Sequence, residues 1–272
     1  MRNRIPLLFA FGTCCASVVA AAPISTADLV SALVAGLSVG EPLRIGSLAV
    51  FPLVARSPLR EPATRIVTIG EAMEHAWLTL RRQDLWAAPR VLMDSWADAA
   101  IFLAAGEELP GTAGLVLTRD VLAAPGVRGL SLPVSPAFPP AGPPAEMAVA
   151  VFPATCEGLL VAIGSQVVSV DLFPSAWFLA RMKAGVLRRS ARAALASRDQ
   201  TGLDREDAEA FLLNLNDLAW TRREPVSLGL EVVGAGPGVE ADALVLGGAL
   251  VHLAVVTHEE HLLLGASEPQ RP

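Results

Sequence analysis

Several residue types are scarce in this chain of 272 residues, and each scarcity narrows what the protein can be. Tyrosine is absent, and Lys183 is the only lysine beside 20 arginines, a bias that we attribute to coding composition rather than to chemistry. Charged residues make up only 18% of the chain and the net charge is −6. The broad basic field that binds nucleic acid is therefore missing, and we predict no nucleic-acid partner.

Cysteine is also scarce, with three residues in the whole chain. Cys14 and Cys15 lie in the apolar N-terminal segment, so Cys156 would be alone in the mature protein and no internal disulfide is expected. We interpret Cys156 as a small apolar side chain of the core rather than as a nucleophile.

Long hydrophobic runs are missing beyond the N-terminus, although 53% of the residues are hydrophobic and the mean hydropathy is +0.49. A helix that crosses a bilayer needs about 20 consecutive apolar residues. Because no later segment approaches that length, we predict no membrane span after removal of the N-terminal segment.

The N-terminus has the pattern of a secretory signal. Arg2 and Arg4 form a basic start, residues 5–19 are apolar, and small residues precede Ala21. We predict a signal peptide over residues 1–20 and export to the periplasm or the extracellular space. The alternative is a cytoplasmic protein with an apolar N-terminal extension.

The remaining sequence predicts an α+β fold, with a largely antiparallel or mixed sheet and packed helices. Strands occur in groups separated by turn residues, and helices fall between the groups. We expect one domain over residues 25–257, a possible Pro-rich linker at 136–144 and a flexible tail at 258–272. The expected helices are 25–36, a stretch from Thr68 through Leu80, 174–197 and 204–215.

A β-hairpin is the clearest local prediction. Residues 158–163 and 166–172 are apolar and flank Gly164-Ser165, a two-residue loop typical of a type II′ turn. Alternation within each strand predicts one apolar face, covered by Phe178, Met182 and Val186 of the following helix.

Four short motifs suggest chemistry but lack the context that the chemistry requires. Ser38 lies in a G-x-S-x-G pattern, yet a helix rather than a strand precedes it. A glycine-rich segment at 234–238 has no helix after it. The segment 258–261 is one residue short of H-E-x-x-H, and we predict no metal site there. An arginine stripe on one helix is better explained as a solvated face; it consists of Arg181, Arg188 and Arg192.

The best candidates for a functional site are carboxylates and one histidine. Glu107 and Glu108 lie between glycines, where a ligand or water can approach the backbone. His252 interrupts an apolar strand, and a buried histidine needs a hydrogen-bond partner. Together with Asp171, these residues could supply a general base or bind a sugar hydroxyl. The alternative is that both glutamates are solvated and His252 bonds to the backbone.

Several segments between residues 47 and 256 are together similar to the ARPP type-one domain family, named for ADP-ribosylglycohydrolase and rhodanese-phosphatase associated protein. Their order and spacing carry the resemblance; they are 48–53, 68–72, 106–111, 132–135, 158–173 and 251–254. The polar cluster typical of the family after Gly111 is replaced here by Ala113-Gly-Leu-Val116, and Pro136 and Ala137 replace a Cys and a Glu. The resemblance implies, by association, a small-molecule or nucleotide-derived ligand; nothing identifies a cofactor.

Two functions remain open from the sequence. The first is a ligand-recognition or structural module without complete catalytic machinery, which the missing polar cluster favours. The second is a hydrolase-like enzyme that acts on an ADP-ribosyl or other nucleotide-derived substrate through Glu107 or Glu108, His252 and Asp171. The two differ in whether these side chains converge in one cleft with perturbed pKa values.

Overall fold

A computed structural model describes residues 26–84, 89–136, 152, 155–196 and 201–257. Within these residues nine strands form the largest sheet, in the order β1-β3-β12-β13-β17-β16-β15-β14 with β2 paired to β3. These strands are β1 (Leu37–Val39), β2 (Leu43–Ile45), β3 (Leu48–Ala55), β12 (Gly158–Ile163), β13 (Gln166–Leu172), β14 (Ala219–Arg223), β15 (Leu230–Gly236), β16 (Val239–Leu246) and β17 (Ala249–Thr257).

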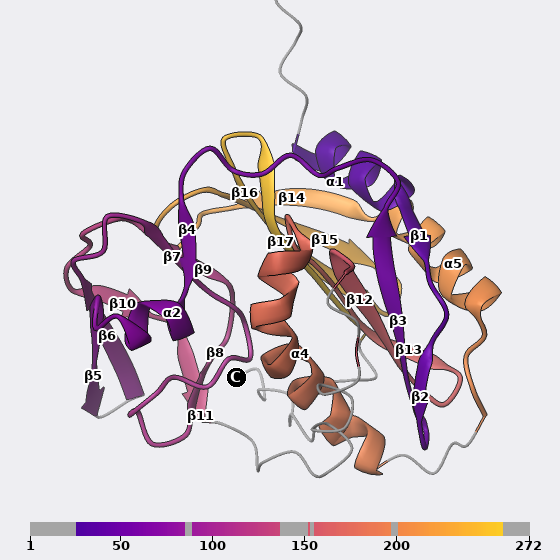
Figure 1. Cartoon of the computed structure of the whole chain (residues 1–272), viewed down its shortest axis with the longest axis horizontal. Coiled ribbons are helices and arrows are strands. Elements are labelled where there is room, and N and C mark those ends of the chain that lie inside the picture. Colours follow the sequence, from indigo (N-terminus) through magenta and orange to yellow (C-terminus); the bar gives the residue numbers. More distant parts are fainter. Residues whose placement is uncertain (1–25, 85–88, 137–151, 153–154, 197–200, 258–272) are drawn as a thin grey trace, which may run out of the picture.

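A second group of short strands lies beside the large sheet, on the left of Figure 1. It contains three small sheets, with orders β10-β6-β5, β11-β8 and β4-β7-β9. The strands are β4 (Ile66–Thr68), β5 (Leu78–Asp84), β6 (Pro89–Ser95), β7 (Ala100–Leu103), β8 (Leu115–Leu117), β9 (Val121–Ala123), β10 (Leu130–Leu132) and β11 (Val134–Pro136). We call this group the small lobe. Among the described strand pairs only β4 and β7 run parallel, so the fold is mostly antiparallel β.

Helices cover both faces of the large sheet. Helix α4 (Ala176–Ala196) packs on one face, where Phe178, Met182 and Val186 are buried against β12 and β13. Helices α1 (Thr26–Ala35) and α5 (Arg205–Asn214), followed by the short η1 (Leu215–Asp217), cover the opposite face. Because the sheet is covered on both sides, its central strands are apolar on both sides as well.

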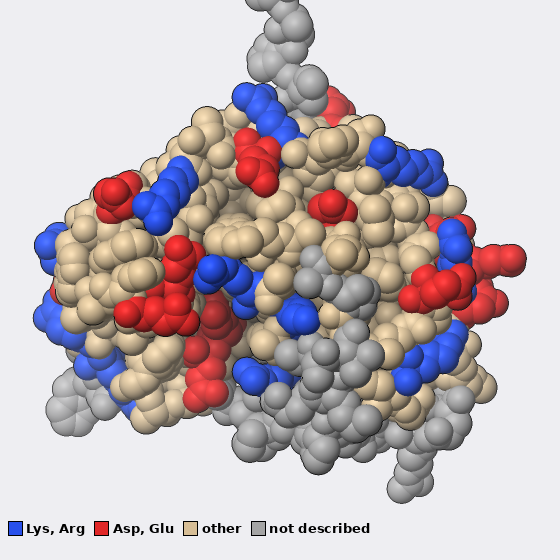
Figure 2. Space-filling view, in the orientation of Figure 1, with Lys and Arg blue, Asp and Glu red and all other residues tan. Residues whose placement is uncertain are grey.

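Helix α2 (Ile69–Glu74) belongs to the small lobe and faces α4. Its first turn is capped by the Thr68 hydroxyl, which accepts a hydrogen bond from the backbone N–H of Glu71 at 3.3 Å. The Glu71 carboxylate also lies 3.7 Å from the Arg181 guanidinium of α4. Acidic and basic side chains gather along this boundary between the small lobe and α4 in Figure 2.

The predicted hairpin forms between β12 and β13, with Ile163 opposite Gln166. Gly164 has a φ of +60° and Ser165 does not adopt a positive φ, as a type II′ turn requires. The alternation also predicts that Val168, Val170 and Leu172 share one face of β13, and this detail is wrong. A bulge leaves Val168 between Val167 and Ser169, which pair with Ala162 and Val161. Val168 therefore packs toward α4 whereas Val170 and Leu172 pack on the opposite face.

A second correction concerns the expected helix from Thr68 through Leu80. Helix α2 ends at Glu74, Ala76 has a φ of +53°, and the chain from Leu78 onward is the strand β5. A residue in the left-handed region cannot continue an α-helix, so the apolar spacing in this segment combines two elements. Of the expected Pro-rich linker, Pro136 is the last residue of β11, and residues 137–144 lie outside the described residues, as does the tail. No helix in the described part of the chain has the length and apolar character needed to cross a bilayer.

Candidate functional site

The large sheet itself brings Asp171 and His252 together. Strands β13 and β17 are antiparallel neighbours, and Asp171 is opposite Ala254. His252 is two residues from Ala254 and therefore on the same face, so its ring is the diagonal neighbour of Asp171. The His252 Nε2 lies 3.3 Å from an Asp171 oxygen. Both side chains are fully buried, with 0% exposure.

Asp120 of the small lobe contacts the other nitrogen of the same ring. It lies in the turn between β8 and β9, and its Oδ2 is 2.6 Å from His252 Nδ1. Its second oxygen accepts a hydrogen bond from the backbone N–H of Ala105 at 2.8 Å. We call Asp120, His252 and Asp171 the buried triad. Asp120 and His252 are 132 residues apart in sequence, so their contact links the small lobe to the large sheet.

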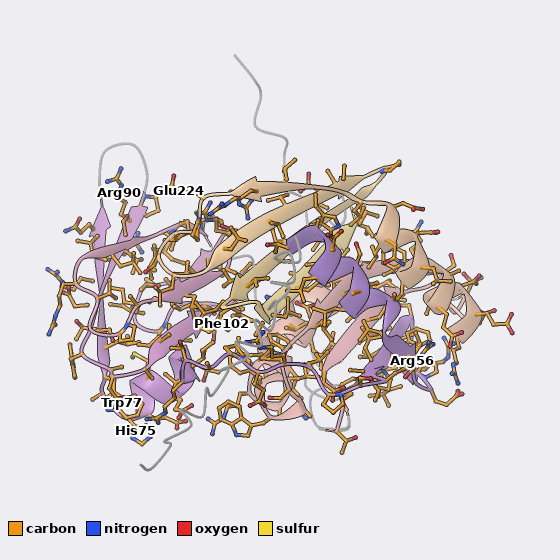
Figure 3. The ribbon with its side chains drawn as sticks, turned by 90° about the horizontal axis from the view of Figure 1, so that it is seen from above. Arg56, His75, Trp77, Arg90, Phe102 and Glu224 are labelled. Carbon is orange, nitrogen blue, oxygen red and sulfur yellow. The ribbon has the colours of Figure 1, made fainter. Side chains whose placement is uncertain are left out.

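Aromatic rings enclose the imidazole on its remaining sides. Phe173 stacks on His252 with ring centroids 4.4 Å apart, and Phe102 of β7 meets it edge-on at 5.6 Å. Phe102 lies near the middle of Figure 3, where the small lobe meets the large sheet. These contacts exclude water and fix the ring orientation, and so make its contacts with both carboxylates stronger than they would be in solvent.

The environment of the triad determines the charge of the histidine. Burial alone would lower the pKa of His252, but the Asp120 carboxylate, by its charge and hydrogen bond, together with Asp171 raises that pKa to about 9. The imidazole is therefore protonated at neutral pH, and each ring N–H donates to one carboxylate.

The two glutamates differ sharply in environment. Glu108 is exposed, whereas Glu107 is partly buried and its carboxylate accepts a hydrogen bond from the backbone N–H of Ala104 at 3.2 Å. Burial raises the pKa of Glu107 to about 7, and the nearby charge of Asp120 acts in the same direction against the effect of the Ala104 hydrogen bond. Glu107 is thus electrostatically coupled to the buried triad through Asp120.

A second group of charges lies close enough to Asp120 to feel its charge, and one member, Arg119, is its neighbour in sequence. Arg223 of β14 forms ion pairs with Glu231 and with Asp242, the latter at 2.6 Å, and Arg119 lies 3.5 Å from Glu231. Burial raises the pKa of Asp242 to about 6, although the Arg223 guanidinium acts in the opposite direction. Each buried carboxylate in this group has an arginine beside it, as a low-dielectric environment requires.

The structure therefore brings together His252 and Asp171, places Glu107 near them through Asp120, and leaves Glu108 in solvent. Asp120 was missed from sequence. Its only signal was a carboxylate in a short turn, and nothing in the local pattern pairs that turn with a strand far along the chain. Of the described residues, no group of three or more His, Cys, Asp and Glu side chains is arranged to hold a metal ion.

The weaker motifs have structural explanations. The Gly36 N–H bonds to the carbonyls of Ala32 and Leu33 and ends α1, while Ser38 lies on β1 and donates to Val54. The glycine-rich segment 234–238 is the β15–β16 hairpin. The histidines at 258 and 261 lie outside the described residues.

The arginine stripe and the cysteine also fit structural roles. In the stripe, Arg181 covers the Trp177 ring at 4.5 Å, and the Arg188 side chain is exposed; nothing is described of the Arg192 side chain. Cys156 is buried, and burial raises the pKa of its thiol to about 11, which keeps it in the unreactive protonated form.

Comparison with known proteins gives one family match. Residues 145–256 match the family model ARPP-1, described as the ARG and Rhodanese-Phosphatase-superfamily-associated Protein domain. This match confirms the resemblance over the part of the chain that carries Asp171 and His252. The preceding segments, with Glu107 and Asp120, lie outside it. No curated protein and no solved structure matched the chain.

Proposed function

We propose that this chain is a ligand-recognition module without a catalytic cycle of its own. The observation that carries the proposal is the seal around the buried triad: His252 and Asp171 are 0% exposed, and both ring nitrogens contact carboxylates. A general base needs a free nitrogen lone pair within reach of the substrate. A protonated, enclosed imidazole offers neither.

The triad instead acts as a rigid joint, because it fixes the small lobe relative to the large sheet. It ties the turn at Asp120 to the centre of the large sheet, and removal of either partner would leave an uncompensated charge in the interior. A rigid joint between two groups of strands holds surface residues on both sides in a constant arrangement, which lowers the entropic cost of binding a ligand.

The class of ligand follows from the family association. Proteins of the matched family are associated with ADP-ribosylglycohydrolase and rhodanese-phosphatase proteins. This association supports a nucleotide-derived small molecule as the ligand, and an open groove on the small lobe offers a place for it.

The proposal is tested by measuring binding and turnover on the same sample. The purified chain is titrated with ADP-ribose by calorimetry, and the mixture is then analysed for products by mass spectrometry, together with an ADP-ribosylated peptide. We expect heat of binding and unchanged ligand. Product formation at a rate proportional to protein concentration would contradict the proposal.

One observation favours the hydrolase-like alternative. Glu107 is partly accessible and has a pKa of about 7, which suits a general acid or base at neutral pH. Under this alternative Glu107→Gln abolishes turnover, whereas the neighbouring Glu108→Gln, which removes an exposed carboxylate, does not. Equal activity of both variants with the wild type, or no activity in any of the three, excludes Glu107 as the catalytic group.

We also propose that the protein is exported. The support is the basic start and the apolar segment 5–19, followed by small residues before Ala21. Mass spectrometry of the protein from its natural source should find Ala21 as the first residue. Recovery of the intact N-terminus from the cytoplasm would reject export.

A further inference from the structure

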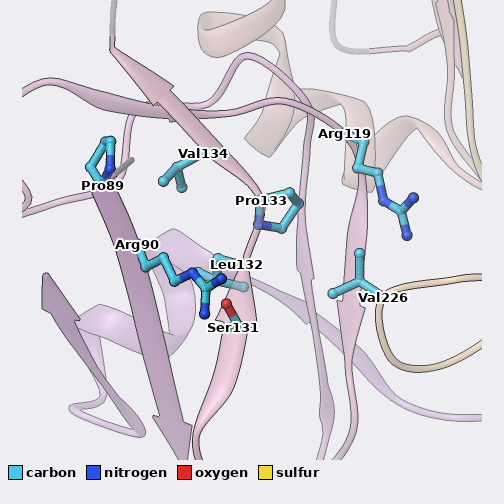
Figure 4. A pocket seen from close by; sticks show the side chains of 8 residues that line it. All are labelled: Pro89, Arg90, Arg119, Ser131, Leu132, Pro133, Val134 and Val226. Atoms are coloured by element: carbon cyan, nitrogen blue, oxygen red, sulfur yellow. The ribbon is translucent and has the colours of Figure 1, made fainter. Parts of the chain in front are cut away.

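An open groove with a cavity volume of about 490 Å³ lies on the small lobe, and its lining includes Arg119, the neighbour of Asp120 in sequence. Four parts of the chain that are distant in sequence form it: the start of β6, Arg119 before β9, the segment of β10 and β11, and Val226 after β14. Figure 4 shows the lining side chains, which are Pro89, Arg90, Arg119, Ser131, Leu132, Pro133, Val134 and Val226. This volume falls within the range of small-molecule sites, about 300–1,000 Å³.

We infer that this groove binds an anionic small molecule, of the class of phosphate esters and diphosphates, between the guanidinium groups of Arg90 and Arg119. The inference rests on the proposed recognition function and assigns that function a site and a ligand charge. The protein as a whole carries a net charge of −6, so two arginines and no lining carboxylate make the groove a local exception.

Arg119 is held in place before any ligand arrives. Its guanidinium donates a hydrogen bond to the backbone carbonyl of Glu224 at 2.9 Å and lies 3.5 Å from the Glu231 carboxylate. Both contacts come from the large-sheet side of the molecule. A guanidinium that is already immobilised loses little rotamer entropy when an anion binds to its exposed part.

Arg90 contributes charge that is not used elsewhere in the described part of the chain. Its side chain is exposed at the start of β6, and none of the described acidic side chains forms an ion pair with it. The Glu224 side chain is not part of the groove lining. An exposed arginine of this kind can pair with a phosphate through two parallel hydrogen bonds.

The rest of the lining suits the body of such a ligand. In Figure 4 the Ser131 hydroxyl lies beside Arg90, and Pro133 lies between the two arginines. The Pro133 and Val226 side chains offer apolar surface, which fits the flat face of a sugar or base rather than a fully charged ion. Two cations separated by an apolar wall favour a ligand that has both an anionic group and an apolar ring.

The experiment measures binding of pyrophosphate and of ADP to the full chain by calorimetry, at low and at moderate salt. We expect ADP to bind more tightly than pyrophosphate, and both to weaken with salt, because surface charge attraction is screened. Arg90→Ala should weaken both about tenfold, the size of one charge-assisted hydrogen bond. Arg90→Lys should recover part of the loss for pyrophosphate.

The matched control is Arg222→Ala, which removes the same charge from an exposed position on the edge strand β14 outside the groove. Binding should be unchanged in this variant. Equal loss in Arg90→Ala and Arg222→Ala would show that only the overall charge matters and would overturn the site, as would the absence of binding by either probe. Arg119 is left intact because its removal would take away one of the two arginines beside the buried Glu231 carboxylate and could disturb the fold.

The outcomes for the groove and for the proposed function are separable. Pyrophosphate binding that depends on Arg90, combined with turnover of ADP-ribosyl substrates, would support the groove and reject the recognition module. ADP-ribose binding that is insensitive to Arg90→Ala would support a recognition module and overturn the groove as its site.

Discussion

Asp120→Asn isolates the charge that keeps His252 protonated. Asparagine has the same size, and its oxygen can still accept the hydrogen bond from Ala105. The substitution removes the negative charge 2.6 Å from the imidazole. Without that charge, the effect of burial, which lowers the His252 pKa, is no longer outweighed by Asp120. A rise from the ordinary value of 6.5 to about 9 is worth roughly 2–3 kcal/mol at pH 7. We expect the free energy of unfolding to fall by about that amount.

The pH dependence provides the sharper measurement. Because the folded-state pKa of His252 is raised, its contribution to stability is complete below pH 6.5 and is lost as the pH rises through about 9. Between pH 7.5 and 9 the wild type should lose about 1.5 kcal/mol, and Asp120→Asn should lose almost nothing. Asp242, with a pKa of about 6, titrates below this window and Cys156, with a pKa of about 11, above it; Glu107, at about 7, is mostly ionised at its start.

Urea unfolding followed by tryptophan fluorescence, at pH 7.5, 8.25 and 9, measures these values. Asp98→Asn is the control, since it makes the same chemical change at a side chain that is 83% exposed. Its stability should stay within about 0.5 kcal/mol of the wild type. If the wild type and Asp120→Asn show the same slope with pH, His252 is not charged in the folded protein and the reasoning on the triad is wrong.

Three other substitutions test neighbouring parts of the structure by the same unfolding assay. Because the pKa of Glu107 is raised to about 7, the wild type should lose stability as the pH rises from 4.5 to 7, and Glu107→Gln should reduce that loss. Glu108→Gln should keep the wild-type dependence on pH. The same dependence in Glu107→Gln and in the wild type would refute burial of Glu107. Met182→Asp should cost about 3–5 kcal/mol because it buries an unpaired charge under α4, and an unchanged midpoint would show that α4 packs otherwise. Gly158→Ala should cost about 1–3 kcal/mol because the new methyl group would lie 2.6 Å from a backbone oxygen of β13. Gly185→Ala should stabilise the protein by about 0.5–1 kcal/mol, because Gly185 lies in a helix and has open space around it. The reverse order would contradict the register of the hairpin.

Local signals in the sequence were enough to predict the elements whose neighbours are close in the chain. The hairpin around Gly164 needs only two apolar strands and a permissive turn, and α5 needs only a capping Asp204 before a helical pattern. The bulge at Val168 was not predictable in this way, because it depends on how β13 meets β12 and β17 together. Strand β5 was misassigned because Ala76, two residues after the end of α2, has no side-chain signal for its positive φ.

A residue of the candidate site could be predicted only where it stands out within its own strand. His252 stands out because it interrupts an apolar strand, and Asp171 is a carboxylate one residue before the end of a predicted strand. Their partnership follows from the pairing of β13 with β17, which a single sequence does not encode locally. Asp120 and the arginines of the groove depend on contacts between the small lobe and the large sheet, and long-range contacts of this kind leave no periodic pattern.

The turn at Arg119 and Asp120 is where the interior and the surface of this protein meet. Successive residues of the turn send their side chains to different places: Asp120 contacts His252 in the core, and Arg119 lies between the Glu231 carboxylate and the groove. Both contacts cross from the small lobe to the large sheet, so one short turn is held from two sides. A guanidinium fixed in this way can hold an anion without rearrangement. The buried triad is a costly group of charges in the core, and its role in holding this turn would explain why it is kept. The triad and the groove are thus two consequences of the same turn, one structural and one proposed for binding.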